Sequence, residues 1–310
     1  MAPLEGITGF VFRNAYEKYY GGVDCYFTPF ITPHTKKNMD AREQRDILPE
    51  NNKVGKLVPQ VMTNRAEELI SISRELSELG YREINLNLGC PSGTVAAKGK
   101  GAGFLKEPDA LERFFDTYFS QSEVPLSVKT RIGMEEEEEW ERLLGVYQKF
   151  PFTELIVHPR LQREFYRGTV HLDAFIMALK QCSCPVCYNG DLFSLSDYER
   201  WKEQIPACDR IMLGRGLLWN PQLVAEIREG SEQEFEPETF FAFHDAVVSG
   251  YQTYISGDRN VLFRLKELWG YWIELFPDEK KQLKKIRKAG TLMEYAAEVQ
   301  TLKARSQVRA

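Results

Sequence analysis

Residues 84–105 of this chain read "INLNLGCPSGTVAAKGKGAGFL", beginning as a strand and ending as a loop rich in glycine and lysine. The start of this stretch, 84–89, is typical of a strand that is buried on both faces of a parallel sheet. Cys90 and Pro91 follow at the end of this strand, where an α/β barrel carries its chemistry. Cys90 alone fits three roles: a catalytic acid, a small buried hydrophobic residue, or one side of a phosphate cradle.

Seven other segments of similar character predict the remaining strands of a barrel. They alternate with stretches of helical periodicity, such as 66–79, which is followed by Gly80, a residue suited to end a helix. Eight such units in about 230 residues predict an α/β fold, a (β/α)8 TIM barrel rather than an open doubly wound sheet. The first segment begins at Met1 and is very short, which leaves open whether this start is natural or truncated. The seven segments are 1–4, 25–31, 57–62, 126–132, 154–159, 185–190 and 210–215.

Beyond residue 235 the pattern becomes helical throughout. We therefore expect two domains, a barrel formed by 1–235 and a small all-helical domain formed by 236–310. The end of the second domain is strongly basic, because only Glu294 and Glu298 oppose a larger set of cations. A solvated helix face and a clamp on phosphates explain this charge equally well. The cations are Lys280, Lys281, Lys284, Lys285, Arg287, Lys288, Lys303, Arg305 and Arg309.

The composition is that of an ordinary globular protein. The 310 residues are 43% hydrophobic with a formal net charge of −5, and the mean hydropathy is −0.40. The sequence contains no apolar run of about 18 residues, so no membrane span is predicted. The first ten residues lack the features of a signal peptide. The six cysteines do not form a disulfide framework. We therefore expect a cytoplasmic protein without a membrane partner.

Polar residues end several of the predicted strands. Lys129, in "SVKTRI", is the least expected of them, because a lysine inside a doubly buried strand needs an anionic or acceptor partner. It fits a Schiff-base amine or a cation that stabilises negative charge on a reduced flavin. After the last two strands, Gly190, Gly214 and Gly216 would let backbone N–H groups approach a phosphate, and Arg215 would add a donor.

Taken in order and spacing, these segments resemble the tRNA-dihydrouridine synthase family. The resemblance runs from residue 1 to about residue 225, and a looser similarity continues through "FRLKELWGYW" in the helical part. It implies a flavin-binding barrel followed by a helical tRNA-binding domain, and a monomer with no implied protein partner. The motifs that carry it are "MAPLEGITGFVFR", "PQVM", "NLNLGCPSGTVAAKGKGAGFL", "VKTRIG", "VHPR", "NGD" and "GRGLLWNP".

The resemblance also implies the site residues. Cys90 corresponds to the catalytic cysteine, Gln60 and Lys129 to side chains at the flavin ring, and His158 to a histidine of the flavin site. FMN is the implied cofactor and NADPH its implied reductant. The positions that correspond to the family's FMN contacts are Pro3, Leu4, Glu5, Gln60, Lys129, His158, Asn189, Gly190, Asp191, Gly214 and Arg215.

The reaction of the family explains why a cysteine would be needed. Reduction of uridine takes a hydride at C6 and a proton at C5, and an acid on the face opposite the flavin must supply the proton. A thiol with an ordinary pKa of about 8.5 is protonated at neutral pH and can act as this acid. We expect the loop from Lys98 to Gly103 to close over the base, with its glycines providing mobility and its lysines meeting RNA phosphates.

The substrate implied by the resemblance is tRNA. A uridine must leave the base stack to reach a flavin inside a barrel, which implies a flipped or looped-out nucleotide. Asn87 and Arg131 correspond to positions near this base or its flanking phosphate, and Arg264 and Lys266 to a basic motif of the helical domain. The expected tRNA-binding residues are Asn87, Lys98, Lys100, Arg131, Arg264 and Lys266.

Some features depart from the family or suggest other chemistry. Gly9 replaces a residue that is commonly polar, and Pro159 replaces a common glycine, which puts in doubt only the loop beside the flavin phosphate. "CSCPVC" at 182–187 looks like a metal motif, but no second pair completes a tetrahedral site, so no metal is expected. "EEEEE" at 135–139 is expected to be the solvated start of a helix.

Two alternative functions remain open. A flavin barrel acting on a small molecule would share the phosphate corner and Lys129 but would not need a basic helical tail. A tRNA-binding protein without catalytic activity would not need Cys90. The sequence does not determine which uridine is reduced, whether NADPH or NADH is used, or the oligomeric state.

Overall fold

The computed structural model describes residues 1–33 and 38–307, and its core is a closed barrel of parallel strands. Residues 34–37 and 308–310, which include Arg309, lie outside the described residues. The expected TIM barrel with a C-terminal helical region is confirmed. Its strands are β1 (Tyr26–Phe27), β2 (Leu57–Val58), β3 (Gln60–Val61), β4 (Ile84–Leu88), β5 (Leu126–Gly133), β6 (Leu155–Leu161) and β7 (Val186–Tyr188).

A few backbone hydrogen bonds close the barrel where two segments are too short to count as strands. The order β3-β4-β5-β6-β7 forms one sheet and β1-β2 another, and every pairing is parallel. Beside β7, Met212 N donates to Tyr188 O (2.7 Å), and Ala2 N donates to Leu213 O (2.7 Å). Phe27 N then donates to Met1 O (3.2 Å). The segments at 1–2 and 211–213 therefore take the places of the first and last predicted strands.

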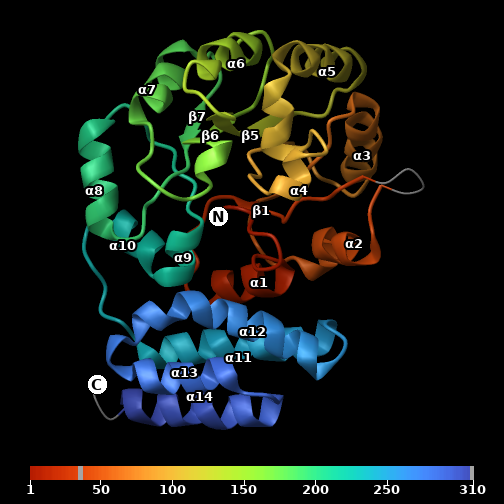
Figure 1. The fold of residues 1–310 in the computed structure, drawn as a ribbon. Coiled ribbons are helices and arrows are strands. Elements are labelled where there is room, and N and C mark those ends of the chain that lie inside the picture. Colours follow the sequence, from red (N-terminus) through yellow and green to blue (C-terminus); the bar gives the residue numbers. More distant parts are fainter. Residues whose placement is uncertain (34–37, 308–310) are drawn as a thin grey trace.

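Helices cover the outside of this barrel (Figure 1). Their termini follow local rules: Asp40 caps α2 and forms a capping box with Glu43, and Ser194 caps α8. The helices are α1 (Phe10–Tyr19), α2 (Ala41–Ile47), α3 (Ala66–Glu78), α4 (Gly93–Ala96), α5 (Pro108–Gln121), α6 (Glu139–Tyr147), α7 (Leu172–Gln181), α8 (Leu195–Gln204), α9 (Arg215–Trp219) and α10 (Leu223–Glu229). Short 3-10 helices are η1 (Pro49–Asn51), η2 (Gly101–Lys106), η3 (Gln162–Glu164), η4 (Ile273–Leu275) and η5 (Pro277–Glu279).

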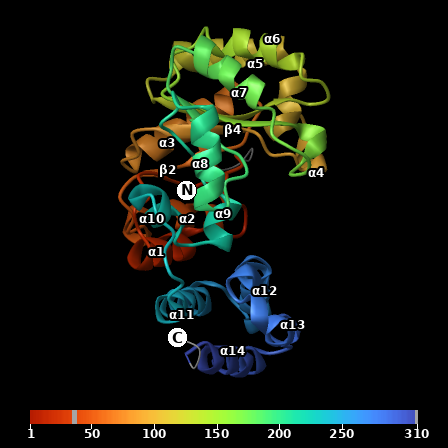
Figure 2. The same cartoon turned by 90° about the vertical axis from the view of Figure 1, so that its left-hand side faces the viewer.

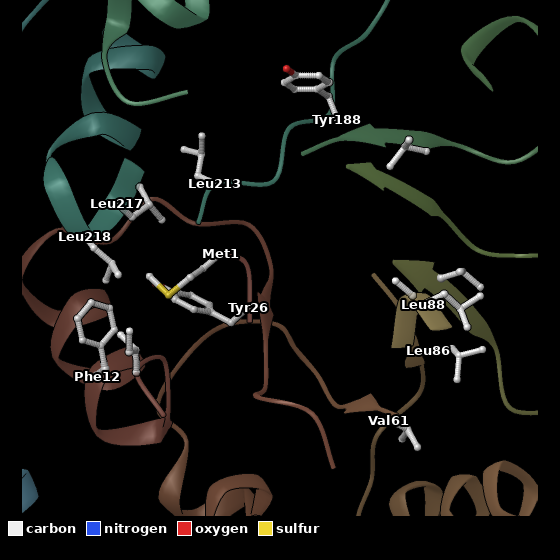
Figure 3. Close-up of a cluster of buried hydrophobic side chains, with 14 of the residues drawn as sticks. Met1, Phe12, Tyr26, Val61, Leu86, Leu88, Tyr188, Leu213, Leu217 and Leu218 are labelled. Carbon is white, nitrogen blue, oxygen red and sulfur yellow. The ribbon is translucent and has the colours of Figure 1, made fainter. Parts of the chain in front are cut away.

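The hydrophobic core is built from buried side chains of both the strands and the helices. All five side chains of β4 are buried, as expected for a strand covered on both faces. Figure 3 shows Met1 beside Tyr26, with Leu217 of α9 close by. Met1 is 7% exposed, and its amino group donates to Cys25 O (2.6 Å). The start of the described chain is therefore packed inside the barrel wall.

Four long helices form a separate layer beneath the barrel (Figures 1 and 2). They pack around aromatic side chains, among which Trp269 and Trp272 are fully buried and lie 5.4 Å apart between ring centroids. In the described part of the chain, no helix is both long and apolar enough to cross a membrane. The helices are α11 (Pro237–Tyr254), α12 (Asp258–Trp272), α13 (Lys280–Lys288) and α14 (Leu292–Gln307).

Helix α11 joins the helical layer to the barrel by packing closely against α1. The rings of Phe12 and Phe243 meet edge to face with centroids 5.5 Å apart. Gly250 of α11 faces Val11 of α1 so closely that a Cβ at this glycine would overlap Val11 Cγ1. The relative position of the two parts therefore depends on a small residue at 250.

We predict that Gly250→Ala destabilises the protein by about 1–3 kcal/mol, because the added methyl group must push α11 away from α1. Gly270→Ala is the matched control: it lies inside α12 with nothing within 4 Å of the added Cβ. Its higher helix propensity should stabilise the protein by up to about 1 kcal/mol. Denaturant unfolding of both variants measures this, and equal effects would contradict the packing assigned to Gly250.

Candidate active site

Most of the expected site residues meet in one cavity at the carboxyl ends of the strands. Ala2, Phe30, Tyr166 and Phe193 complete its wall. The expected residues that do not line it are Gln60, Lys98, Lys100, Arg264 and Lys266. Those that do line it are Pro3, Leu4, Glu5, Asn87, Cys90, Lys129, Arg131, His158, Asn189, Gly190, Asp191, Gly214 and Arg215.

A chain of side-chain amides positions the backbone at Cys90. Asn87 Oδ1 accepts hydrogen bonds from Gly89 N (3.1 Å) and Cys90 N (2.9 Å), and Asn87 Nδ2 donates to Gln60 Oε1 (2.7 Å). Gln60 Nε2 in turn donates to Asn85 Oδ1 (2.8 Å). Gln60 is completely buried, so both polar atoms of its side chain are engaged beneath the cavity. Asn87 and Gln60 therefore orient the turn that carries Cys90.

The loop after Cys90 is packed tightly against it. Gly101 has a positive φ of 56°, and a Cβ there would lie 2.9 Å from Cys90 Cβ. Ala102 N donates to Cys90 O (3.1 Å), and a Cβ on Gly103 would overlap the backbone of Ala96. Gly101 and Gly103 are therefore positions of close packing, and the expected mobility of this loop stays a prediction. Lys98 is exposed on the preceding turn.

Four cationic side chains surround the interior of the cavity, and Lys129 is the one without a partner. Among the described residues, no hydrogen bond or ion pair to Lys129 Nζ is present, although the side chain points into a buried site. Burial, together with the nearby Arg131, lowers the pKa of Lys129 to about 8. An ammonium group held in this way fits an anionic or electron-rich ligand. The other cations are Arg131, Arg160 and Arg215.

Arg131 uses its donors on the protein itself. Its Nε donates to Gly89 O (2.9 Å), its Nη1 to Leu161 O (2.9 Å), and its Nη2 to Phe165 O (2.6 Å). Arg131 is fully buried and therefore ties the turn before Cys90 to the loop after β6. These bonds use three of the five N–H donors of the guanidinium group, and the expected contact of Arg131 with RNA stays a prediction.

Asp191 balances the cations on the other side of the cavity. It pairs with Arg160 through both carboxylate oxygens and accepts from Arg215 Nη2 (2.8 Å). His158 Nε2 lies 3.2 Å from Arg160 Nη1, and burial and the neighbouring cations hold the pKa of His158 well below its usual 6.5. His158 is therefore neutral at physiological pH, and Asp191 orients the two arginines.

Arg160 and Tyr166 are site residues that sequence reasoning did not assign. Arg160 lies in β6 next to its last residue, is fully buried, and donates to Arg167 O and Gly168 O. Tyr166 is 48% exposed, with its ring 4.6 Å from the Arg215 guanidinium and stacked on His158 at 6.0 Å. The available signal was an aromatic pair, "FY", within the polar loop "LQREFYRG".

The features that suggested other chemistry lie away from this cavity. Cys182 is the residue that follows α7, and Cys187 is buried in β7. Across the described residues, no three side chains of the metal-binding types gather around one point. The acidic run at 135–139 leads into a helix, as expected, because its last residue, Glu139, begins α6. The Glu139 carboxylate accepts hydrogen bonds from Met134 N (2.8 Å) and Glu135 N (2.9 Å).

The donor set fits a flavin nucleotide. Lys129 offers a half-buried cation without a partner among the described residues, and Arg215 offers a partly exposed guanidinium next to two glycines. Gly190 and Gly214 both line the cavity, and a Cβ at Gly190 would overlap the ring of Tyr188 beneath it. The cavity therefore combines a cation for an electron-rich ring with a backbone that can approach a phosphate.

Comparison with solved structures supports the barrel fold. Over 77% of this chain and 88% of the other, the fold matches morphinone reductase with a TM-score of 0.53 and 11% identity. Histamine dehydrogenase from Rhizobium sp. 4-9 matches with the same TM-score, covering 82% of this chain and 48% of the other. At such low identity these similarities establish the architecture alone. The class of protein defined by fold and site is a TIM-barrel oxidoreductase.

The sequence comparisons establish the family. The family model "Dihydrouridine synthase (Dus)" matches residues 1–303, and the chain belongs to this family. A probable tRNA-dihydrouridine synthase 2 of Bacillus subtilis is 28% identical over 76% of this chain and 73% of its own length. A tRNA-dihydrouridine(16) synthase of Aquipseudomonas alcaligenes is 29% identical over 76% of this chain and 77% of its own length.

Proposed function

We propose that this protein reduces a specific uridine of tRNA to 5,6-dihydrouridine, using FMN bound in the barrel and NADPH as the source of electrons. The observation that carries the proposal is the cavity itself, which both the thiol of Cys90 and the unpartnered ammonium of Lys129 line. Family membership supplies the reaction class, and the substrate named for the relatives is tRNA. Reduced FMN, when bound, supplies the hydride.

Residues on two sides of the cavity would hold the cofactor. Lys129 would face the electron-rich part of the ring, where its charge stabilises negative charge. Asn189, Gly190, Gly214 and Arg215 would surround the phosphate, with Asp191 holding Arg215 in place. The segment Pro3, Leu4 and Glu5 would contribute the remaining wall, and neutral His158 would add a ring nitrogen without a further charge.

Cys90 would provide the proton for C5 of the uracil. Its backbone is fixed by Asn87, and the loop at Gly101 packs against it from the other side. A thiol donates a proton to a developing carbanion more readily than a hydroxyl does, because it is the stronger acid. Tyr166 stands exposed at the mouth, where its ring would lie against a base entering the cavity.

The helical part would hold the rest of the tRNA. We propose a boundary at residues 235 and 236, with the barrel catalytic and the helices RNA-binding. The cations of α13 are all exposed, and one of them, Lys285, lies 3.9 Å from an acidic group, Glu298. This surface suits phosphate contacts. The cations of α13 are Lys280, Lys281, Lys284, Lys285, Arg287 and Lys288.

A reaction with purified components tests the proposal. FMN-loaded protein, NADPH and an unmodified tRNA transcript should yield tRNA heavier by two hydrogen atoms at one uridine, as mapped by mass spectrometry of nuclease fragments. Omission of NADPH should prevent the change unless the flavin is first reduced chemically. Consumption of NADPH with small enones but never with tRNA would show that the protein is a small-molecule reductase instead.

We predict that Asn87→Ala slows dihydrouridine formation by about 10- to 100-fold, because Cys90 loses the acceptor that fixes its backbone. The KM for tRNA should change much less than kcat, and the rate at which iodoacetamide alkylates Cys90 should also change. Asn87→Asp keeps the acceptor oxygen and should restore part of the activity. An equal loss in both variants, with unchanged alkylation, would show that Asn87 does not act through Cys90.

A further inference from the structure

A second cavity lies directly beside the candidate active site. It has a volume of about 480 Å³ and shares Glu5 and Phe30 with the first cavity. One wall comes from the barrel, including Ile7 and α2, and the other from α11, α12 and the turn between them. The chemistry proposed above does not use this cavity.

The exposed aromatic residues of the protein gather at these two cavities. In the described part of the chain, the large hydrophobic side chains that are exposed are Phe165, Tyr166, Tyr254, Phe263 and Met293. Tyr166 lines the first cavity, with Phe165 next to it in the chain, while Tyr254 and Phe263 line the second. Phe263 is 66% exposed on α12, although nothing in the barrel chemistry requires an apolar group there. Exposed rings beside a cavity are typical platforms for stacked nucleobases.

Guanidinium groups surround this apolar floor. Arg45 Nη1 donates to Tyr254 O (2.9 Å), Arg42 Nη2 pairs with Glu5 (2.9 Å), and Arg264 Nη1 lies 3.3 Å from Glu267. Each of these contacts uses one end of a guanidinium, which can donate five N–H groups in total. All three arginines line the cavity and can therefore still meet phosphates or a base edge.

Two of the three acidic groups that line the cavity, Asp46 and Glu43, face the protein, and the third, Glu5, pairs with Arg42. Asp46 accepts from Phe10 N (2.6 Å) and pairs with Arg13 (3.0 Å). Glu43 accepts from Thr32 N (2.9 Å) and also closes the capping box of α2. The ligand-facing character of the cavity is therefore aromatic and cationic.

We infer that this cavity binds a second nucleotide of the substrate RNA, next to the uridine that enters the first cavity. The inference rests on the proposed function, because it takes RNA as the substrate. The helical part forms half of the cavity, which favours a ligand that the barrel alone could not hold. A nucleotide base would stack on Phe263, and its phosphates would meet Arg45 and Arg264. Such a subsite would fix which uridine reaches Cys90.

Binding of flavin-free protein to tRNA tests the inference without requiring any reaction. A set of transcripts, each carrying one abasic residue in a single-stranded region, is titrated against wild type and Phe263→Ala. We expect Phe263→Ala to weaken binding of intact tRNA about tenfold. One abasic position should weaken wild-type binding to the same extent and have no further effect in the variant. Phe263→Tyr should bind like wild type, and Met293→Ala is the exposed-residue control.

Three outcomes would overturn the inference. Unchanged affinity of Phe263→Ala would show that the ring contacts no RNA, and additive losses at every abasic position would show that it contacts no single base. A higher NADPH requirement for flavin reduction in Phe263→Ala, with unchanged RNA binding, would assign the cavity to the dinucleotide. The proposed reaction is judged separately. If one abasic position weakens binding only when Phe263 is present, but no dihydrouridine is ever formed, the reaction is refuted and the RNA subsite is still supported.

Discussion

Replacing Cys90 by alanine will stop dihydrouridine formation almost completely, with an expected loss of about 10²–10⁴ in rate. The proton required at C5 would then have to come from water, which the packed loop of Gly101 and Ala102 partly excludes. Flavin content and the rate of flavin reduction by NADPH should remain those of wild type, because Cys90 acts only on the base. Single-turnover reaction of chemically reduced enzyme with tRNA measures the step directly.

Two further variants make this result specific. Cys90→Ser keeps a similar shape but is a much weaker acid, so it should remain close to the alanine variant. Cys182→Ala removes a half-buried thiol at the end of α7 and should leave the rate unchanged. A Cys90→Ala enzyme that turns over within a factor of three of wild type would remove Cys90 from the mechanism.

Replacing Lys129 by methionine should weaken FMN binding by at least tenfold and at the same time stabilise the flavin-free protein. The half-buried lysine lines the cavity and has no partner among the described residues, so its charge destabilises the fold until an anionic or electron-rich ligand arrives. For a protein of this size, each kcal/mol gained should raise Tm by about 2–4 °C. Thermal unfolding with and without FMN measures both effects, and a lower Tm without FMN would contradict them.

The pH dependence follows from the depressed pKa of Lys129. In the fold this group loses its proton near pH 8, whereas in the unfolded chain it does so near 10.5. Between these values the unfolded state binds more protons, so the stability of the flavin-free protein should rise with pH in this window. FMN affinity should fall as pH rises above about 8, because the cation is lost. Both slopes should disappear in Lys129→Met. The depressed pKa of His158 adds its own rise of stability with pH below this window, up to the unfolded pKa of about 6.5.

The parts of the fold that the sequence predicted were those governed by local patterns. The strand at 84–89 was recognisable because strands of a parallel sheet are apolar runs. Lys129 in β5 was recognisable because the active site of a barrel lies at the carboxyl ends of its strands. The residues around the cavity could be assigned through the resemblance to a family, since their order along the chain was preserved. The short closing segments at 1–2 and 211–213 depend on partners far away in sequence and could not be delimited in advance.

The remaining features depend on tertiary contacts. Asn85 and Asn87 engage the amide of Gln60 beneath the cavity, and its expected contact with the flavin stays a prediction. Arg264 was expected to grip RNA, and its guanidinium lies against Gly6 of the barrel, where a Cβ would overlap it. Tyr166 was missed because its position depends on Arg131 holding the neighbouring carbonyl. None of these contacts follows from spacing along the chain.

The most direct test of the central claim is a map of dihydrouridine in tRNA from cells that lack this protein. We predict that one dihydrouridine disappears, returns with the wild-type protein and does not return with Cys90→Ala produced at the same level. A map that is unchanged in the absence of this protein and of any second enzyme acting at the same position would contradict the claim that it reduces a uridine of tRNA.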